Sequence, residues 1–424
     1  MFSSCQKENP EFQYKVPTKP YEMVKIQKNT SIVLWDSEDY DFETGNAIYT
    51  KQFQEHGKTN ALKTEVGAAC SSWRNGRYHG RNLDWRQEDY GCLIIQMPKG
   101  SNVKHASVAL LNGTSDITQD FISRGEIDTL MRVYLPCAVV DGINDAGVAV
   151  NTNIVIHTPG IKYVKDGNLS NMCVVRYVLD NAGSVDEAIS LLRGRKISQD
   201  IIELAGDETH YMISDKSSTA VVEFKGELMN VIRFNQGEDG CLSGNGTPAI
   251  MTNLYNFAVE DFGIGTDDFF NNHVLALGVE RWKTIQDQYP DAANSVEDNF
   301  NIAQSVWFCK GLLKDKKPRY TDLADEFGYG KDEKGWYYKK DGVRIACDGW
   351  LSAQKGFWDY FIGGYWKRYE DNYGNKPDPH IKGNTYWETS HSVIYDLESK
   401  KGYLYPFENF YSNDGKPIVI CLPK

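Results

Sequence analysis

The sequence predicts a mixed α+β fold. Apolar segments that alternate or run for four to eight residues, typical of β-strands, dominate from residue 70 onward. Amphipathic helical segments begin near residue 172 and again near residue 274, and further strands lie between them. This order of strands, helices, strands and helices is compatible with stacked layers of helices and antiparallel sheets.

Composition excludes several classes of protein. The chain has 424 residues, a net charge of −12 and no Lys/Arg-rich run, which argues against a nucleic-acid partner. No stretch of about 18 apolar residues is present, so no membrane-spanning helix is expected. The nine cysteines show no regular spacing and no CxxC pair, so neither a disulfide framework nor a zinc site is expected. Five of them lie in apolar runs and are predicted to be small core residues: Cys92, Cys137, Cys173, Cys309 and Cys421.

The first 69 residues are interpreted as a leader and a prosegment. Residues 1–25 are polar and contain proline, whereas Thr30–Trp35 is typical of a strand and Ile48–Phe53 is compatible with a helix. The string Met1–Lys7 resembles the end of a bacterial lipoprotein signal, with Cys5 as the candidate lipidated residue, although the charged and apolar parts of a signal peptide are missing. Two interpretations stay open. A start upstream of Met1 would place the protein in the cell envelope, in the periplasm or anchored by lipid, whereas an incidental thiol at Cys5 would allow a cytoplasmic location.

Strands are expected next along the chain, the first two joined by a turn at Arg74–Arg77. A helix follows at Met172–Asn181, and Ser184–Glu187 is a capping box that opens another helix through Leu192. The expected strands before these helices are Cys70–Trp73, Arg77–Asp84, Cys92–Met97, Ala106–Leu111 and Val148–Ile156.

The second half of the chain repeats this order of elements. Residues 314–383 differ, because they are rich in Lys, Asp, Gly, Tyr and Trp, and they are interpreted as a long insertion with little regular core. The chain closes with a hairpin, His391–Leu397 and Gly402–Pro406. The remaining expected elements are the strands His210–Ser214, Ala220–Glu223, Glu227–Arg233 and Ala249–Thr252, and the helices Val274–Gln288 and Val296–Leu312.

Cys70 is the candidate nucleophile. It follows two small residues, Ala68 and Ala69, and begins a strand. A cysteine within a chain needs a separate base, whereas one freed as an N-terminus carries its own. The reference pKa of an α-amino group, about 7.7–8.0, lies close to that of a thiol, about 8.5, so one residue can supply both nucleophile and base. By itself, the short string around Cys70 also suits a buried structural cysteine.

Arg81 and Asp84 are the candidate partners of Cys70. They stand in His79–Trp85, on the second strand of a predicted hairpin that returns to Cys70. A carboxylate there would orient the α-amino group, and a guanidinium would support the thiolate or bind the substrate carbonyl or carboxylate. A surface salt bridge between the two is the alternative.

These motifs resemble the N-terminal-nucleophile (Ntn) hydrolases that cleave linear amides, a family that includes choloylglycine hydrolases, penicillin V acylases, acid ceramidase and N-acylethanolamine acid amidase. The strings Asp141–Val150 and Thr389–Leu397 are similar to further motifs of that family, the second being a structural hairpin. The resemblance implies a four-layer αββα sandwich with antiparallel sheets, and self-cleavage between Ala69 and Cys70. It implies no metal and no organic cofactor.

The resemblance also implies roles for residues further along the chain. Asn253 ends the string Met251–Asn253 and matches the amide that donates to the oxyanion. Asn153, with Asn151 as the second candidate, matches an asparagine that lines the site, and both share one face of a strand because they are two residues apart. Arg281 matches a helix-borne, site-supporting arginine. An ordinary turn residue and an ordinary surface arginine are the alternatives for Asn253 and Arg281.

The expected organisation is a leader and prosegment, residues 1–69, before a catalytic domain, residues 70–424, with an insertion at about 314–383. The prosegment, longer than in bile-salt hydrolases, is expected to stay associated after cleavage of this zymogen. The expected function is an autoprocessing cysteine amidase that hydrolyses a small N-acyl amide: a conjugated bile salt, N-acyl amino acid, N-acylethanolamine or ceramide-like substrate. An acyltransferase of the same fold and a catalytically silent envelope binding protein are the alternatives. A homo-oligomer is compatible with the sequence.

Overall fold

A computed structural model describes residues 23–25, 30–35, 38–59, 70–86, 92–112, 124–126, 129–155, 164, 166–198, 208–225, 227–236, 242–244, 247–253, 279–288, 295–306, 329–348, 387–406 and 416–423. The predicted residues Cys5, Ala69 and Cys309 lie outside these ranges, as do the N-terminal leader and most of the insertion.

The larger of the two main sheets has eleven strands in the order β1-β2-β5-β6-β7-β8-β11-β12-β13-β14-β15. Neighbouring strands are antiparallel, except that β2 runs parallel to β5. Its strands are β1 (Met23–Lys25), β2 (Thr30–Leu34), β5 (Cys92–Met97), β6 (Ser107–Asn112), β7 (Asp141–Asn144), β8 (Ala149–Val155), β11 (Glu208–Ser214), β12 (Ser218–Lys225), β13 (Leu228–Gln236), β14 (Leu242–Gly244) and β15 (Thr247–Pro248).

The second main sheet has six strands in the order β16-β3-β4-β20-β21-β22, all antiparallel. It brings the predicted hairpin that follows Cys70 next to the C-terminal hairpin, more than 300 residues away in sequence. Its strands are β16 (Ile250–Met251), β3 (Ser71–Asn75), β4 (Tyr78–Arg86), β20 (Trp387–Asp396), β21 (Lys401–Pro406) and β22 (Ile418–Cys421).

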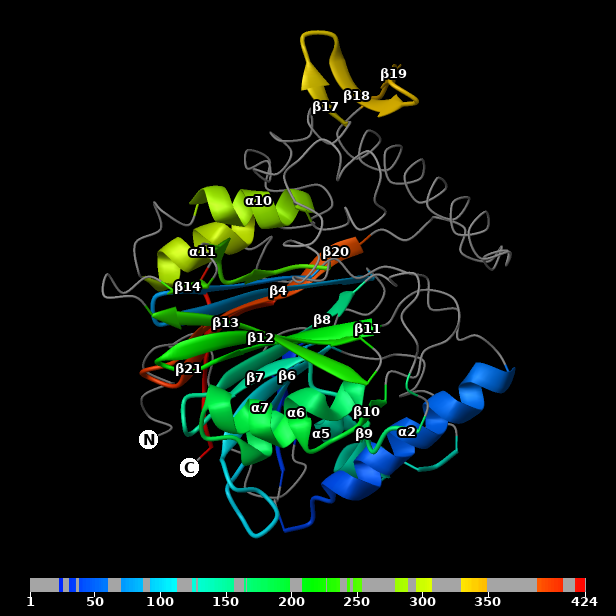
Figure 1. The fold of residues 1–424 in the computed structure, drawn as a ribbon, viewed down its shortest axis with the longest axis vertical. Helices are drawn as coiled ribbons and strands as arrows, with labels where there is room; N and C mark the ends of the chain where they lie inside the picture. Colours follow the sequence, from blue (N-terminus) through cyan, green and yellow to red (C-terminus); the bar gives the residue numbers. More distant parts are fainter. Residues whose placement is uncertain are drawn as a thin grey trace.

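The two sheets pack face to face, and helices cover their outer faces (Figure 1). Ile94, Val108 and Leu110 of the large sheet form a buried core with Val393 and Leu404 of the smaller one. The helices α2 (Phe42–Thr59), α5 (Leu135–Cys137), α6 (Val174–Asn181) and α7 (Val185–Arg193) pack against the large sheet, and α10 (Val279–Gln288) and α11 (Val296–Ser305) cover the smaller one. The predicted αββα sandwich is confirmed.

Local sequence explains where these helices begin. The Ser184 hydroxyl accepts a hydrogen bond from the Glu187 backbone N–H at 3.1 Å, and Ser295 accepts one from Asp298 in the same way. Such caps satisfy N–H groups that the first helical turn leaves without partners. The N-cap predicted at Ser184 is therefore confirmed, whereas the Glu187 carboxylate accepts from the Gly183 backbone N–H at 2.8 Å rather than from Ser184, as a capping box would require. In α6 the apolar stripe that includes Val174 and Val178 faces the core, as its periodicity predicts.

The described part of residues 23–59 is integrated into the large sheet rather than packed beside it. Strand β2 pairs with β5 from Thr30↔Cys92 to Leu34↔Gln96. Trp35 follows β2 and is fully buried, and its indole Nε1 donates to the Met131 carbonyl at 2.7 Å. Helix α2 adds Tyr49, whose ring stacks on Tyr134 with centroids 4.3 Å apart. The N-terminal segment thus completes the hydrophobic core.

Three differences from the expected elements are found. Asp141–Asn144 forms strand β7, whereas only the following residues were expected to be structured, as a turn and strand. The insertion contains a three-stranded sheet of β17 (Tyr329–Asp332), β18 (Gly335–Lys340) and β19 (Val343–Ala346). Cys421 was expected to be a small core residue, but it is disulfide-bonded and only partly buried. Cys92, Cys137 and Cys173 are buried free thiols, as predicted.

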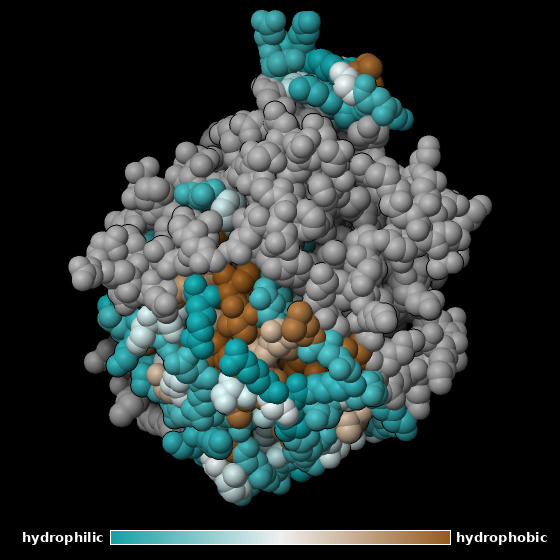
Figure 2. All heavy atoms as spheres, in the orientation of Figure 1, coloured by the Kyte–Doolittle hydropathy of each residue, from teal (hydrophilic) through white to brown (hydrophobic). Residues whose placement is uncertain are grey.

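On the face shown in Figure 2 most of the described residues are hydrophilic, and an apolar area is visible in the region of β12 and β13. Leu228 at the start of β13 has 66% of its surface exposed, the largest value among the described large hydrophobic residues. In the part of the chain that the structure describes, no helix is long and apolar enough to cross a membrane.

Candidate active site

The β3–β4 hairpin places Cys70 at its open end. Gly76 in the connecting turn has φ 51°, a left-handed conformation that favours glycine. The pairs Ser71↔Asn82 and Ser72↔Arg81 then bring the end of β4 back to Cys70. The cysteine is buried, with 2% of its surface exposed. The hairpin thus brings Arg81 and Asp84 close to Cys70, and their roles there stay predictions.

Arg81 approaches Cys70 from the space between the two sheets. Its Nη2 lies 4.0 Å from Cys70 Sγ, the outer limit for a hydrogen bond to sulfur, and donates to the Thr152 carbonyl at 2.9 Å. Its Nη1 forms an ion pair with Asp141 at 2.5 Å. The guanidinium is fully buried. The alternative of a surface salt bridge between Arg81 and Asp84 is therefore wrong.

Arg281 approaches Cys70 from helix α10, on the other side of the sheet. Its Nη1 donates to the Cys70 carbonyl and, at 2.9 Å, to the Ser71 hydroxyl. Its Nη2 donates to Asn253 Oδ1 at 2.6 Å, and Nη1 lies 3.8 Å from Asp84 Oδ2. With 2% of its surface exposed, Arg281 is not the ordinary surface arginine that was the alternative. It connects the nucleophile, the candidate oxyanion donor and the candidate carboxylate.

Asn253 lies at the end of β16, buried and fixed at both ends of its amide. Its oxygen accepts from Arg281, and its nitrogen donates to the Ile154 carbonyl at 2.7 Å. An asparagine amide has two N–H donors, and one of them is used by Ile154 among the described residues. This geometry leaves a second donor for a substrate oxygen.

Asp84 is a buried carboxyl group with little hydrogen bonding. Thr389 Oγ1 donates to its Oδ1 at 2.6 Å, whereas Oδ2 has no hydrogen-bond partner among the described residues. Burial raises the pKa of Asp84 to about 7, and the opposing effects of Arg281, Thr389 and Arg81 are smaller. The carboxyl group is therefore poised to respond to a positive charge at Cys70.

Burial likewise raises the pKa of the Cys70 thiol. Arg81 acts in the opposite direction, as do the backbone N–H of Asp84 and Arg281, whereas the Asp84 carboxylate adds to the rise. Two guanidinium groups on opposite sides of the sheet thus offset part of the cost of forming a buried thiolate.

Asn151 and Asn153 point from β8 toward β3. Asn151 Nδ2 donates to the Ser72 hydroxyl at 2.8 Å, and Ser72 donates to Asn153 Oδ1 at 3.2 Å. Asn153 Nδ2 donates to the Met251 carbonyl at 3.2 Å. The prediction that both asparagines face the same side is confirmed. They lie in the layer beside Cys70 and fix its strand to β16, and no contact with Cys70 itself is seen.

His79 extends this polar network away from Cys70. Its Nε2 lies 2.8 Å from Asn151 Oδ1 and its Nδ1 lies 2.8 Å from Ser214 Oγ. Burial lowers the pKa of His79 to about 4, so the ring is neutral at neutral pH. It is a satisfied core histidine rather than a base for Cys70.

Sequence reasoning missed four residues that contact the candidate site. Thr389 contacts Asp84, and Asp141 accepts from Arg81, His391 and Tyr395. The closing hairpin was expected to support only the fold, yet its strand β20 contacts the site, and the register of β20 shifts between Thr389 and His391. No local pattern reveals these contacts, because Arg81 and Asp141 are 60 residues apart and the contacts of β20 span 250 to 305 residues.

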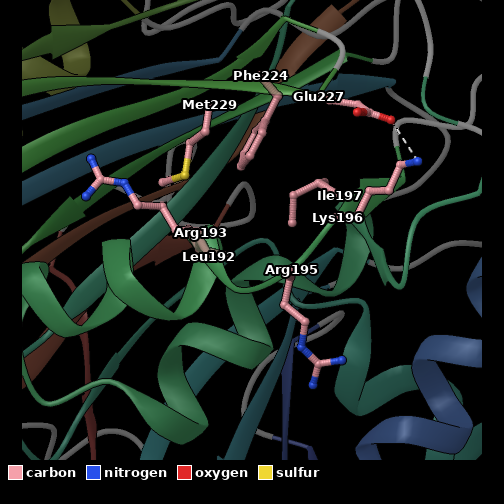
Figure 3. A pocket seen from close by; sticks show the side chains of 8 residues that line it. All are labelled: Leu192, Arg193, Arg195, Lys196, Ile197, Phe224, Glu227 and Met229. Carbon is pink, nitrogen blue, oxygen red and sulfur yellow. Dashed lines mark ion pairs between the residues drawn. The ribbon is translucent and has the colours of Figure 1, made fainter.

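One small cavity lies away from Cys70, on the α7 side of the large sheet (Figure 3). It encloses about 100 Å³, and Arg195 and Lys196 stand at its rim, Lys196 in an ion pair with Glu227. None of the residues predicted for the site line it. Within the described ranges, no three His, Cys, Asp or Glu side chains are placed to hold a metal ion.

Part of the chain matches the model of a known protein family. Residues 70–259 match the model of the linear amide C–N hydrolases, choloylglycine hydrolase family. A penicillin V acylase from Agrobacterium tumefaciens has 14% identity and a TM-score of 0.42, with 80% of this chain and 83% of that chain covered. Two variants of a conjugated bile acid hydrolase from Clostridium perfringens have 16% identity and TM-scores of 0.34 and 0.36, with 83% of this chain and 92% of each variant covered. No curated protein matches the chain.

The described residues form an αββα sandwich with Cys70 at the head of β3, which is the architecture that the sequence resemblance to Ntn hydrolases implies. Residues 70–259 are similar to the linear amide C–N hydrolases of the choloylglycine hydrolase family. The protein is accordingly a hydrolase that acts on carbon–nitrogen bonds in linear amides.

Proposed function

We propose that this protein is an autoprocessing cysteine amidase that cleaves its own chain before Cys70 and then hydrolyses a small N-acyl amide through an acyl-enzyme. The observation that carries the proposal is the position of Cys70, buried between Arg81 on one side and Arg281 on the other. A structural core cysteine needs neither cation, whereas a thiolate nucleophile needs compensating positive charge.

In the self-cleavage step, Cys70 Sγ attacks the carbonyl carbon of Ala69. The peptide C–N bond breaks, the nitrogen of Cys70 takes up a proton, and a thioester to Ala69 forms. Water then hydrolyses this thioester, which releases the Ala69 carboxylate and restores the thiol. Arg281 supports this step because it holds the Cys70 carbonyl and so fixes the backbone beside the scissile bond.

Substrate turnover repeats the same chemistry on an external amide. The free α-amino group of Cys70 accepts the thiol proton and donates it to the leaving amine, the thiolate is acylated, and water releases the acid. In this proposal the second N–H of Asn253 donates to the developing oxyanion, and Arg281 fixes the amide oxygen. Asp84 holds the α-ammonium group.

The N-terminal fragment stays bound after cleavage in this proposal. Residues 30–59 contribute a strand to the large sheet and buried aromatic side chains, including Trp35, Tyr40 and Tyr49, to its core. Asn46 adds two polar contacts, since its Nδ2 donates to the Asn168 carbonyl at 2.8 Å and its Oδ1 accepts from the Ser170 backbone at 2.7 Å. Release of the fragment would expose this core.

The cell envelope is the proposed location, with Cys5 as the candidate for lipidation. The disulfide at Cys421 supports an oxidising compartment. Peptide mapping under non-reducing conditions tests this point. A Cys5–Cys421 bond would exclude lipidation at Cys5.

The deciding experiment is the intact mass of the purified protein, wild type beside Cys70→Ala. Two fragments, 1–69 and 70–424, in the wild type and one uncut chain in the variant are expected. An uncut wild-type chain that stays uncut across pH 4–9 would overturn self-cleavage. A panel of conjugated bile salts, N-acyl amino acids, N-acylethanolamines and ceramides then identifies the substrate. The same assay with added free amines distinguishes hydrolysis from acyl transfer.

A further inference from the structure

A buried polar cluster lies behind Arg81 and is formed by Asp141 of β7 and by His391 and Tyr395 of β20. Asp141 Oδ2 accepts from Arg81 Nη1 at 2.5 Å and lies 3.0 Å from His391 Nε2. Its Oδ1 accepts from the Tyr395 hydroxyl at 2.5 Å. All four side chains are fully buried. Both carboxylate oxygens therefore have hydrogen-bond partners within the cluster, and the cluster joins the two sheets.

We propose that Asp141 is a positioning residue of this site, which fixes the Arg81 guanidinium against Cys70 and is itself fixed by Tyr395 and His391. The inference rests on the proposed function, because it assigns a task to a neighbour of the nucleophile. Asp141 does not reach Cys70, so it acts through Arg81.

The charge state of the cluster suits this task. Burial by itself would raise the pKa of Asp141, but Arg81 and His391 outweigh it and hold the pKa below its usual value. Burial lowers the pKa of His391, so its ring is neutral and donates Nε2–H to Asp141. Asp141 is thus a full negative charge that faces the single positive charge of Arg81.

Without Asp141, the guanidinium would be free to turn. Among the described residues, its remaining contacts are the Thr152 carbonyl, the Cys70 sulfur and a long approach to His391 Nε2 at 3.4 Å. Asp84 is the next carboxyl group near Arg81, with an oxygen that lacks a hydrogen-bond partner in the described part of the chain. An ion pair between Arg81 and Asp84 would remove both groups from their tasks at Cys70.

The chain offers a matched control for a purely structural role. On the outer side of the large sheet, Arg176 Nη1 pairs with Asp180 Oδ1 at 3.2 Å, and both side chains are buried. Asp180→Asn breaks a buried Asp–Arg pair by the same chemical change as Asp141→Asn, away from Cys70. Loss of a buried pair destabilises the fold in both variants. A lower rate of self-cleavage in Asp141→Asn than in Asp180→Asn therefore reports an effect at the site rather than on stability.

The test follows the self-cleavage of full-length chains by intact mass after cell-free synthesis, with thermal midpoints measured in parallel. Asp141→Asn is expected to slow cleavage by about 10²-fold, as misplacement of a catalytic group does. Asp141→Glu should recover part of the rate, Tyr395→Phe should lose less, and Asp180→Asn should cleave as the wild type does. Wild-type cleavage in a folded Asp141→Asn chain, or an equal loss in Asp180→Asn, would overturn the proposal.

A second readout does not depend on self-cleavage. The rate at which iodoacetamide alkylates Cys70, followed by peptide mass, is compared in the wild type, Arg81→Met, Asp141→Asn and the double variant. The double variant leaves no unpaired buried ion and is expected to fold. If Asp141 acts through Arg81, the double variant reacts as Arg81→Met does; additive effects would refute the assignment. If the wild-type chain never self-cleaves, the proposed function is refuted, but the alkylation rates still test whether Asp141 positions Arg81.

Discussion

Replacement of Asp84 by Asn should stabilise the uncut chain at high pH, and the size of the effect follows from burial of the carboxyl group. The comparison uses the Cys70→Ala background, which cannot self-cleave by the proposed route. In the folded chain the pKa of Asp84 is raised to about 7, mainly by burial, from a reference of 3.8. In the unfolded chain the carboxyl group is exposed to water and returns to the reference.

The sign of the effect is set by proton binding. Between pH 4 and 7 the folded chain holds a proton on Asp84 that the unfolded chain has lost, so the free energy of unfolding falls as the pH rises. The pKa difference corresponds to about 4 kcal/mol in total, of which about 2–3 kcal/mol is lost between pH 5 and 7. Asparagine cannot ionise, so the variant lacks this loss.

The assay is urea unfolding followed by tryptophan fluorescence at pH 5.0, 6.0, 7.0 and 8.0. The difference in free energy of unfolding between Asp84→Asn and its parent should grow by about 2–3 kcal/mol across this range. A difference for Asp84→Asn that is constant with pH would refute the reasoning. In the uncut chain, ionisation of the buried Asp84 lowers the free energy of unfolding. Cleavage creates an α-ammonium group that stabilises the ionised carboxylate, so this destabilisation of the precursor would favour cleavage.

Four further predictions concern the site and the core. Asn253→Ala should leave a folded chain whose self-cleavage or turnover is about 10²–10³-fold slower, and an unchanged rate would exclude it as oxyanion donor. Arg281→Lys keeps the charge but loses the planar fork that holds Cys70 O, Ser71 and Asn253, so a loss of about tenfold or more is expected in the same assay. His79→Gln should make the fold less acid-sensitive between pH 6.5 and 4, because the buried ring stays neutral down to about pH 4 while the unfolded ring charges at 6.5; equal sensitivity in urea titrations would contradict this. Trp35→Ala should cost about 3–5 kcal/mol and release the 1–69 fragment on gel filtration after cleavage, whereas co-elution would argue against its anchoring role.

Local sequence was sufficient for most strands and for the reactive hairpin. A turn around Gly76 with strand residues on both sides fixes the register, and the register alone returns Arg81 and Asp84 to Cys70. The capping serine at 184 and the apolar stripe of α6 fix two helices in the same way. Such signals act over a few residues, so a single sequence carries them.

Sequence patterns were insufficient where partners are distant or where one residue type has several uses. Residues 141–144 are too polar for a typical strand, and only pairing with β6 and β8 makes them one. Cys421 lies in an apolar run like the core cysteines, yet it forms a disulfide, because spatial neighbours rather than local sequence decide which thiols meet.

The sequence by itself thus predicted the α+β class, the hairpin that presents Cys70, and Arg81, Asp84, Asn253 and Arg281 as candidate site residues. The tertiary structure alone decided how these residues meet. Arg81 reaches the cysteine from between the sheets and Arg281 from the helical layer, and Asp141, Thr389, His391 and Tyr395 surround them from strands far away in sequence. The physical reason is that burial sets the charge states and contacts of these groups, and burial is created only when the two sheets and the helices pack together.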